Sequence, residues 1–504
     1  MAVRAQKLYN SMKTKTTKQI LQEQMAEATT YEEWYHAGLQ LDAELGLDLW
    51  RQNPVSDDYD YKLIYHRLQH LMALKDSHDA MTLSNVLRSG LLRNLGGICS
   101  PKLYTQSHVG TKLLIEDYIT AVSSAISYVT SLPAFTPQQT FSFISDTRQS
   151  FGRTTLVLQG GAIFGLCHLG VVKALHSHSL LPRIITGTGV GALIAALVCI
   201  HTDMDLPHFL SGSGIDLTAF ASHPSQNSWT RKLHRLSESG YLLDISVVEE
   251  CVRANVGDLT FEEAYHLTGR ILNITVSTPP DSPLPSCVLN YLTAPHVLIR
   301  TAACASNAPT PPLFADVTLL CKTSSGKIVP FENTDKSSFE WRPYWTPSSQ
   351  DPHTRIAELF NVNHFIVSQA RPYLAPFLTR SPQSLPTRLL GMEISHLLRQ
   401  ADTVGLLPTT VRRFLVDEEI HGGTPESTIL VTPRLEIGDW EWLLKNPEKE
   451  MVRYWVRKGE RAVWDVLERI RVSGEVEGVL DRLYRGMQRG GRKERRGRRR
   501  RDSE

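Results

Sequence analysis

The chain has no long apolar segment and little cysteine, and both absences limit what it can be. Its longest apolar run, residues 193–200, is far shorter than the ~20 residues that a membrane-spanning helix needs. Seven cysteines are scattered through 504 residues without a Cys-x-x-Cys pair, which favours a reducing compartment over a disulfide framework or a zinc site. We therefore expect no metal or other cofactor, and only peripheral contact with any membrane.

The two ends of the chain differ in charge from the rest. The N-terminus is basic but lacks the apolar segment of a signal peptide, so no secretion signal is expected. Residues 485–504 contain ten Lys/Arg and three Asp/Glu, a charge of +7, which leaves −5 for the other residues because the total is +2. This composition favours a disordered basic tail, with binding to anionic phospholipid as an alternative. A nucleic-acid partner is not expected, because no aromatic residues interleave with the basic ones.

The chain also lacks a side chain at the middle of one glycine-rich turn, residues 187–191. Residues 183–186 predict a buried strand, an apolar helix follows, and between them residues 187–191 read Gly-Thr-Gly-Val-Gly. Serine hydrolases hold their nucleophile at the middle of such a strand-to-helix elbow. Here the middle residue is Gly189, flanked by Gly187 and Gly191. Because glycine reaches positive φ freely, the turn is expected to persist without its attacking oxygen.

A second glycine-rich loop precedes the elbow. Residues 154–158 predict a buried strand, and the loop that follows leads into a helix. Gly160, Gly161 and Ala162 have small side chains that leave backbone N–H groups accessible near a helix N-terminus, as an oxyanion hole requires. Two strand–loop–helix units in tandem, at residues 154–178 and 183–201, fit acyl transfer better than a single glycine loop does.

Several stretches of the chain resemble the patatin-like phospholipases and, within them, the fungal triacylglycerol lipases of lipid droplets. The resemblance is carried by residues 158–162, 167–175, 182–185, 187–188, 191–193, 268–276, 289–295 and 359–369. It implies a patatin-like three-layer α/β/α sandwich with an N-terminal helical domain. It also implies an acyl-lipid ligand, either triacylglycerol or phospholipid, and a place on a lipid droplet or on the cytoplasmic side of a membrane. An active paralogue is a further possible partner.

The resemblance also implies a Ser–Asp dyad, of which both members are missing here. The serine position corresponds to Gly189. The aspartate of an Asp-Gly motif is expected near Trp345, where the chain has no Asp-Gly pair, and the nearest carboxylate, Asp351, matches a later position of the family pattern. Since the nucleophile and its base are both absent, we expect a catalytically impaired member of the family.

Composition and periodicity divide the chain into five parts. We expect a mobile polar arm over residues 1–29, a helical domain over 30–150, an α/β domain over 151–370, a helical C-terminal region over 371–484, and the basic tail over 485–504. The helical domain should open at Thr30, where Thr-Tyr-Glu-Glu is typical of a capping box.

Two other functions remain open at this point. One is an active acyl hydrolase or transacylase with an unrecognised nucleophile. The other is a dinucleotide-binding protein, because Gly187, Gly189 and Ala192 fit the G-x-G-x-x-A spacing after a strand.

Four side chains invite a catalytic role but have simpler interpretations. His168 and His364 lie in apolar segments and are expected to be packed, hydrogen-bonded core residues. Ser213 lies in a Ser-Gly-Ser-Gly run that no strand precedes, which indicates a loop. Thr188 has a hydroxyl next to Gly189, but its side chain should point away from the site. The tryptophans at positions 440, 442, 455 and 464 are expected to pack between helices.

Overall fold

The computed structural model describes most of the chain, as two compact units. The described residues are 16–212, 214–216, 218, 245–276, 288–307, 318–331, 352–370, 427–434 and 449–501, with isolated positions between 393 and 439. The helical unit comprises residues 1–153 and 464–504, and the α/β unit comprises residues 154–463. The five-part division stays a prediction. Among the described helices, none combines the length and apolar character needed to cross a bilayer.

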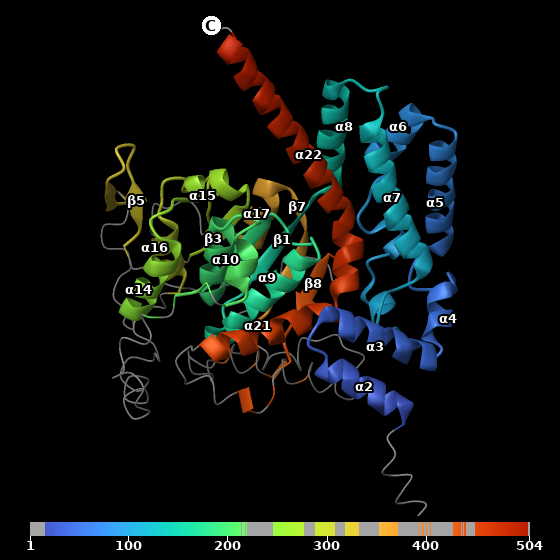
Figure 1. The fold of residues 1–504 in the computed structure, drawn as a ribbon, viewed down its shortest axis with the longest axis horizontal. Helices are drawn as coiled ribbons and strands as arrows, with labels where there is room; N and C mark the ends of the chain where they lie inside the picture. The colour runs from blue at the N-terminus through green and yellow to red at the C-terminus, as the bar shows by residue number, and fades with distance from the viewer. Residues whose placement is uncertain are drawn as a thin grey trace, which may run out of the picture. The chain divides into compact units, whose positions relative to one another are not determined.

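The helical unit is built mainly of α-helices (Figure 1). They are α2 (Thr17–Glu27), α3 (Tyr31–Glu44), α4 (Leu47–Gln52), α5 (Tyr61–Asp76), α6 (Ala80–Gly90), α7 (Leu113–Ser131), α8 (Pro137–Phe151) and α22 (Leu467–Arg501), with 3-10 turns η1 (Leu95–Gly97) and η2 (Pro101–Tyr104). The capping box predicted at the start of α3 is confirmed. The Thr30 hydroxyl accepts from the Glu33 amide at 3.3 Å, and the Glu33 carboxylate accepts from the Thr30 amide at 3.3 Å.

The C-terminal helix α22 belongs to the core of this unit. Val476 and Leu480 are buried there among side chains of α5, α7 and α8. The buried Arg93 guanidinium forms an ion pair with Glu477 at 3.0 Å. The backbone of α22 stays helical to Arg501, through most of the segment that composition marks as disordered, because arginine and lysine are good helix formers.

The α/β unit is built on a six-stranded sheet in the order β4-β3-β2-β1-β7-β8. The strands are β1 (Arg153–Leu158), β2 (Ile184–Gly187), β3 (Ile271–Thr275), β4 (Val288–Leu289), β7 (Val362–Ser368) and β8 (Thr428–Val431). β2 is parallel to β1 and to β3, β8 is parallel to β7, and β4 is antiparallel to β3. β8 falls within residues 371–484, where the sequence predicts a mainly helical region. β5 (Leu320–Lys322) and β6 (Ile328–Pro330) form a separate hairpin.

Helices cover both faces of this sheet (Figure 1), so the three-layer patatin-like arrangement is confirmed. They are α9 (Cys167–Ser177), α10 (Val190–Ile200), α11 (Leu206–Leu210), α14 (Ile245–Val256), α15 (Phe261–Thr268), α16 (Ile299–Asn307), α17 (Pro352–Phe360) and α21 (Lys449–Trp464), with the 3-10 turn η3 (Ala162–Leu166). Leu158, the last residue of β1, lies opposite Gly187, the last residue of β2. The two loops that follow therefore leave the sheet side by side at the carboxyl edge, where ligand sites of α/β proteins form.

Candidate active site

The turn between β2 and α10 has the backbone shape that a nucleophile elbow needs. Gly189, the N-cap of α10, has φ 59° and ψ −129°. A side chain is strained in this region, whereas glycine is not. The Thr188 amide donates to the Leu158 carbonyl at 3.0 Å, which fixes the turn against the end of β1. The role of Gly189 as the position of a lost nucleophile stays a prediction.

Both flanking glycines are required by close backbone contacts. A Cβ at Gly187 would lie 2.5 Å from the Ala192 Cα, and a Cβ at Gly191 would lie 2.0 Å from the Leu158 carbonyl oxygen. Neither contact is possible without moving backbone, which explains on packing grounds why these positions are glycine.

The Gly189 amide is held by a hydroxyl that belongs to none of the sequence motifs. It donates to Ser306 Oγ at 2.9 Å, and Ser306 Oγ donates to the Thr275 carbonyl at 2.7 Å. Ser306 lies on α16 and is buried. Its contact joins residues 117 positions apart, so no local sequence pattern could have revealed it.

The predicted oxyanion loop lies directly beside the elbow. A Cβ at Gly160 would be 3.4 Å from the Thr188 carbonyl oxygen, and a Cβ at Gly161 would be 2.4 Å from the Ala370 carbonyl oxygen. The loop backbone therefore runs between the elbow and the end of β7, and Ala162 begins η3. The structure thus brings together the two glycine-rich segments that the sequence places in one site.

His168 is a buried, neutral histidine at the base of this loop. Its Nε2 lies 2.7 Å from the Gln159 carbonyl and its Nδ1 lies 2.7 Å from Ser368 Oγ. A carbonyl only accepts, so Nε2 carries the proton and Nδ1 accepts from the serine. Burial lowers the pKa of His168 to about 4. The ring therefore fixes the start of the loop to β7 and has no free nitrogen to act as a base.

Because His168 is buried in its neutral form, we expect the folded protein to lose stability in mild acid. The folded-state pKa of His168 is about 4, and an unfolded histidine has a pKa of about 6.5. As the pH falls, the unfolded state binds this proton before the folded state does. The contribution of neutral His168 to the free energy of unfolding is therefore complete above about pH 6.5, and it falls by about 3 kcal/mol by about pH 4. In urea titrations across this range, His168→Gln should lose less unfolding free energy than the natural protein. Parallel curves for both would contradict a neutral His168.

The other tempting residues also have partners or lie outside the described part of the chain. His364 is buried, with its Nδ1 3.3 Å from Thr154 Oγ1. The Thr188 hydroxyl lies 2.6 Å from Thr275 Oγ1 on β3. Ser213 and the predicted position of the base, from Trp345 to Asp351, lie outside the described residues.

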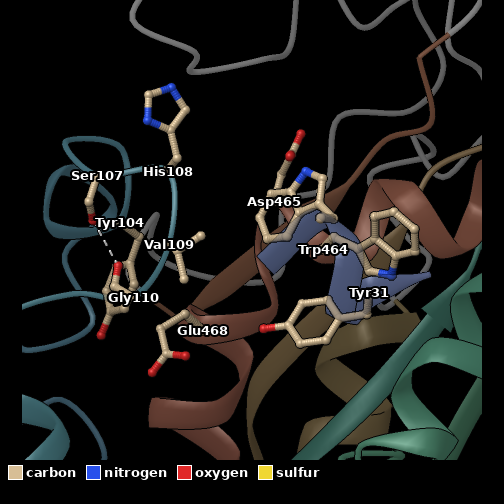
Figure 2. A pocket seen from close by; sticks show the side chains of 10 residues that line it. Tyr31, Tyr104, Ser107, His108, Val109, Gly110, Trp464, Asp465 and Glu468 are labelled. Carbon is tan, nitrogen blue, oxygen red and sulfur yellow. Dashed lines mark hydrogen bonds between the residues drawn. The ribbon is translucent and has the colours of Figure 1, made fainter. Parts of the chain in front are cut away.

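A small pocket in the helical unit contains none of the predicted site residues. Figure 2 shows Tyr31, Trp464 and Glu468 among the side chains that line it. The Tyr31 ring stacks on Trp34 at 5.9 Å, and Trp34 lies 6.1 Å from Trp464. Burial raises the pKa of Glu468, which is paired with Arg471 at 2.8 Å. Because the aromatic rings pack on one another and the Glu468 carboxylate is paired, we interpret this pocket as a packing contact between helices of the helical unit.

Two consecutive parts of the chain match different family profiles. The patatin-like phospholipase profile matches residues 156–365, which include the glycine loop, the elbow and Ser306. A profile described as a domain of unknown function, DUF3336, matches residues 11–149. The α/β sheet with an elbow at its carboxyl edge is thus that of a patatin domain.

Curated relatives extend this similarity over nearly the whole chain. Triacylglycerol lipase ptl1 of Schizosaccharomyces pombe is 35% identical over 91% of this chain and 84% of its own length. Triacylglycerol lipase ptl3 of the same organism is 31% identical over 92% and 96%. Triacylglycerol lipase 5 of Saccharomyces cerevisiae is 30% identical over 93% and 66%. The chain belongs to the patatin-like phospholipase family, in the subgroup of fungal triacylglycerol lipases, as its sequence motifs predicted.

Proposed function

We propose that this protein handles acyl lipids, either triacylglycerol or phospholipid, and that its ester hydrolysis is severely impaired. The observation that carries the proposal is Gly189 at φ 59° in the elbow, where a hydrolase has its serine. The relatives named triacylglycerol lipases support an acyl-lipid ligand. Loss of a nucleophile in a triad-type enzyme lowers kcat by about six orders of magnitude, so turnover should be undetectable by ordinary assay.

The geometry gives little support to an unrecognised nucleophile at this site. Among the described residues, Ser306 and Thr188 bring hydroxyls to the elbow. Both are buried, and each is already hydrogen-bonded, Ser306 to the Thr275 carbonyl and Thr188 to the Thr275 hydroxyl. Attack by either would first require breaking these bonds and exposing the side chain.

In the part of the chain that the structure describes, the dinucleotide alternative has no acidic residue at the expected place. In such proteins an Asp or Glu at the end of the next strand binds the ribose. The next strand along the chain after β2 is β3, which ends in Thr275. Asp203, which follows α10, is paired with Arg183 at 3.2 Å and with Arg270. We therefore expect that the purified protein does not retain labelled NAD.

A fluorophosphonate probe tests the loss of catalysis directly. We expect the purified protein to remain unlabelled, and to release no fatty acid from triacylglycerol or phospholipid above a heat-denatured control, because Gly189 has no oxygen to react. Mass spectrometry of the digested protein should find no adduct. An adduct on any serine between residues 150 and 370 would overturn the proposal and establish an active hydrolase.

We also propose peripheral attachment to lipid droplets or to the cytoplasmic side of membranes. The basic tail supports it, because each Lys or Arg near an anionic surface contributes about 1 kcal/mol. Pairing with an active relative of the same family is the protein partnership that we propose, and co-purification of tagged protein from its own cells would test it. Recovery of no patatin-like partner would count against such pairing.

Removal of residues 489–504 should weaken flotation with anionic liposomes. The cut keeps Tyr484 and Met487, which pack on the core of the helical unit. It removes nine Lys/Arg and three Asp/Glu, a charge of +6. The loss should be largest at low salt, since ions screen the attraction, and neutral liposomes provide the control. If flotation is equal at every salt concentration, the tail does not contribute to binding.

A further inference from the structure

Helix α21 lies next to α9 (Figure 1), and the two backbones approach each other closely at a pair of glycines. A Cβ at Gly459 of α21 would lie 1.9 Å from the Cys167 carbonyl oxygen, and a Cβ at Gly170 of α9 would lie 1.8 Å from the Val456 carbonyl oxygen. At the contact, each helix therefore has a glycine, Gly170 in α9 and Gly459 in α21, which lets the other backbone come close. Beside this crossing, Lys173 Nζ and Glu460 Oε1 form an ion pair at 2.6 Å.

The same helix forms a wall of the candidate oxyanion loop. Trp455 is fully buried, and its ring meets Phe164 of η3 edge to face at 5.3 Å. Met451 and Trp455 form one cluster with Phe164, Cys167 and Ala370. Ala370 is also the residue that lies directly against Gly161. The loop is thus enclosed between α21 and the end of β7.

A polar cluster fixes α21 on a different side. The buried Asp439 carboxylate accepts hydrogen bonds from the Tyr454 hydroxyl and the Lys458 ammonium, and from the Glu436 amide at 2.7 Å. Tyr454 and Lys458 are one helical turn apart. α21 is therefore in contact with α9 on one side and, through Tyr454 and Lys458, with Asp439 on another.

We propose that α21 completes the candidate acyl site, with Trp455 as the positioning residue that holds the loop over residues 160–166. This helix lies outside the patatin match, which ends at residue 365. The functional meaning of the inference rests on the proposed acyl site. The packing itself can be tested without turnover, so failure of one proposal is distinguishable from failure of the other.

Hydrogen exchange of the full-length protein tests the role of Trp455. In Trp455→Ala, amides of residues 160–166 should exchange about tenfold faster, while residues 184–200 at the elbow keep their protection, because local openings change independently. Trp455→Phe should restore slow exchange, since it keeps a ring against Phe164 and, among the described residues, the indole Nε1 has no hydrogen-bond partner to lose. Unchanged exchange in the alanine variant, or no rescue by phenylalanine, would overturn the inference.

A matched pair of glycine variants separates displacement of α21 from general destabilisation. Gly459→Ala forces the helix away from α9 and should accelerate exchange of the same loop. Gly474→Ala also places alanine in a helix, but its Cβ meets nothing within 4 Å, so the loop should be unaffected. Equal loosening of loop and elbow in Gly459→Ala, or loop loosening in Gly474→Ala, would refute a specific role for α21.

Discussion

Gly191→Ala is expected to abolish stable folding of the α/β unit. The added Cβ would lie 2.0 Å from the Leu158 carbonyl oxygen and 3.0 Å from the Gln159 carbonyl oxygen. Leu158 also accepts the Thr188 amide, so moving its carbonyl breaks the bond that fixes the elbow. Both atoms belong to backbone and no rotamer relieves the clash, so the unfolding free energy should fall by roughly 4 kcal/mol or more. Urea denaturation followed by circular dichroism measures the loss.

Gly438→Ala is the control within the same unit. Its Cβ would meet nothing within 4 Å, and the residue is exposed. The variant should unfold at the same urea concentration as the natural protein. If Gly191→Ala were equally stable, the contact between the first turn of α10 and the end of β1 would not exist in solution.

The elements at the site could be predicted because their signals are local. Buried strands at residues 154–158 and 183–186 appear as short apolar runs, and β1 and β2 begin and end within a residue of them. The capping box at Thr30 is contained in four residues. The glycine spacing at residues 187–191 predicts the turn, because few other residues tolerate its backbone.

What could not be predicted depends on residues far apart in the chain. β8 is four residues long and is a strand because it pairs with β7, across about sixty intervening residues, so it has no period of its own to detect. Ser306 is chemically ordinary until α16 brings it to Gly189. The composition of α22 indicates a polar helix and tail. It nevertheless belongs to the core of the helical unit, because a few of its valines and leucines contact α7 and α8.

Gly189→Ser should restore a hydroxyl at the elbow at a modest cost in stability. Serine at φ 59° is strained by roughly 1–3 kcal/mol, and Gly189→Ala, which carries the same Cβ without the oxygen, should cost about the same. Agreement between the two variants in urea denaturation would assign the cost to backbone strain. Gross unfolding of both would mean that this turn does not accept a nucleophile at all.

Reactivity of the Gly189→Ser variant should be slow until a base is supplied. In a triad-type enzyme the nucleophile accounts for about six orders of magnitude in kcat and the aspartate for about four and a half, so serine alone should label weakly with a fluorophosphonate probe. Adding an Asp-Gly pair at Pro347 and Ser348, which lie outside the described residues, should raise the labelling rate well beyond either change alone. Gly189→Ala with the same pair should remain unlabelled, since it has a base but no oxygen. Full activity from Gly189→Ser by itself would mean that a base is already in place, and that the loss of one side chain alone separates this chain from an active lipase.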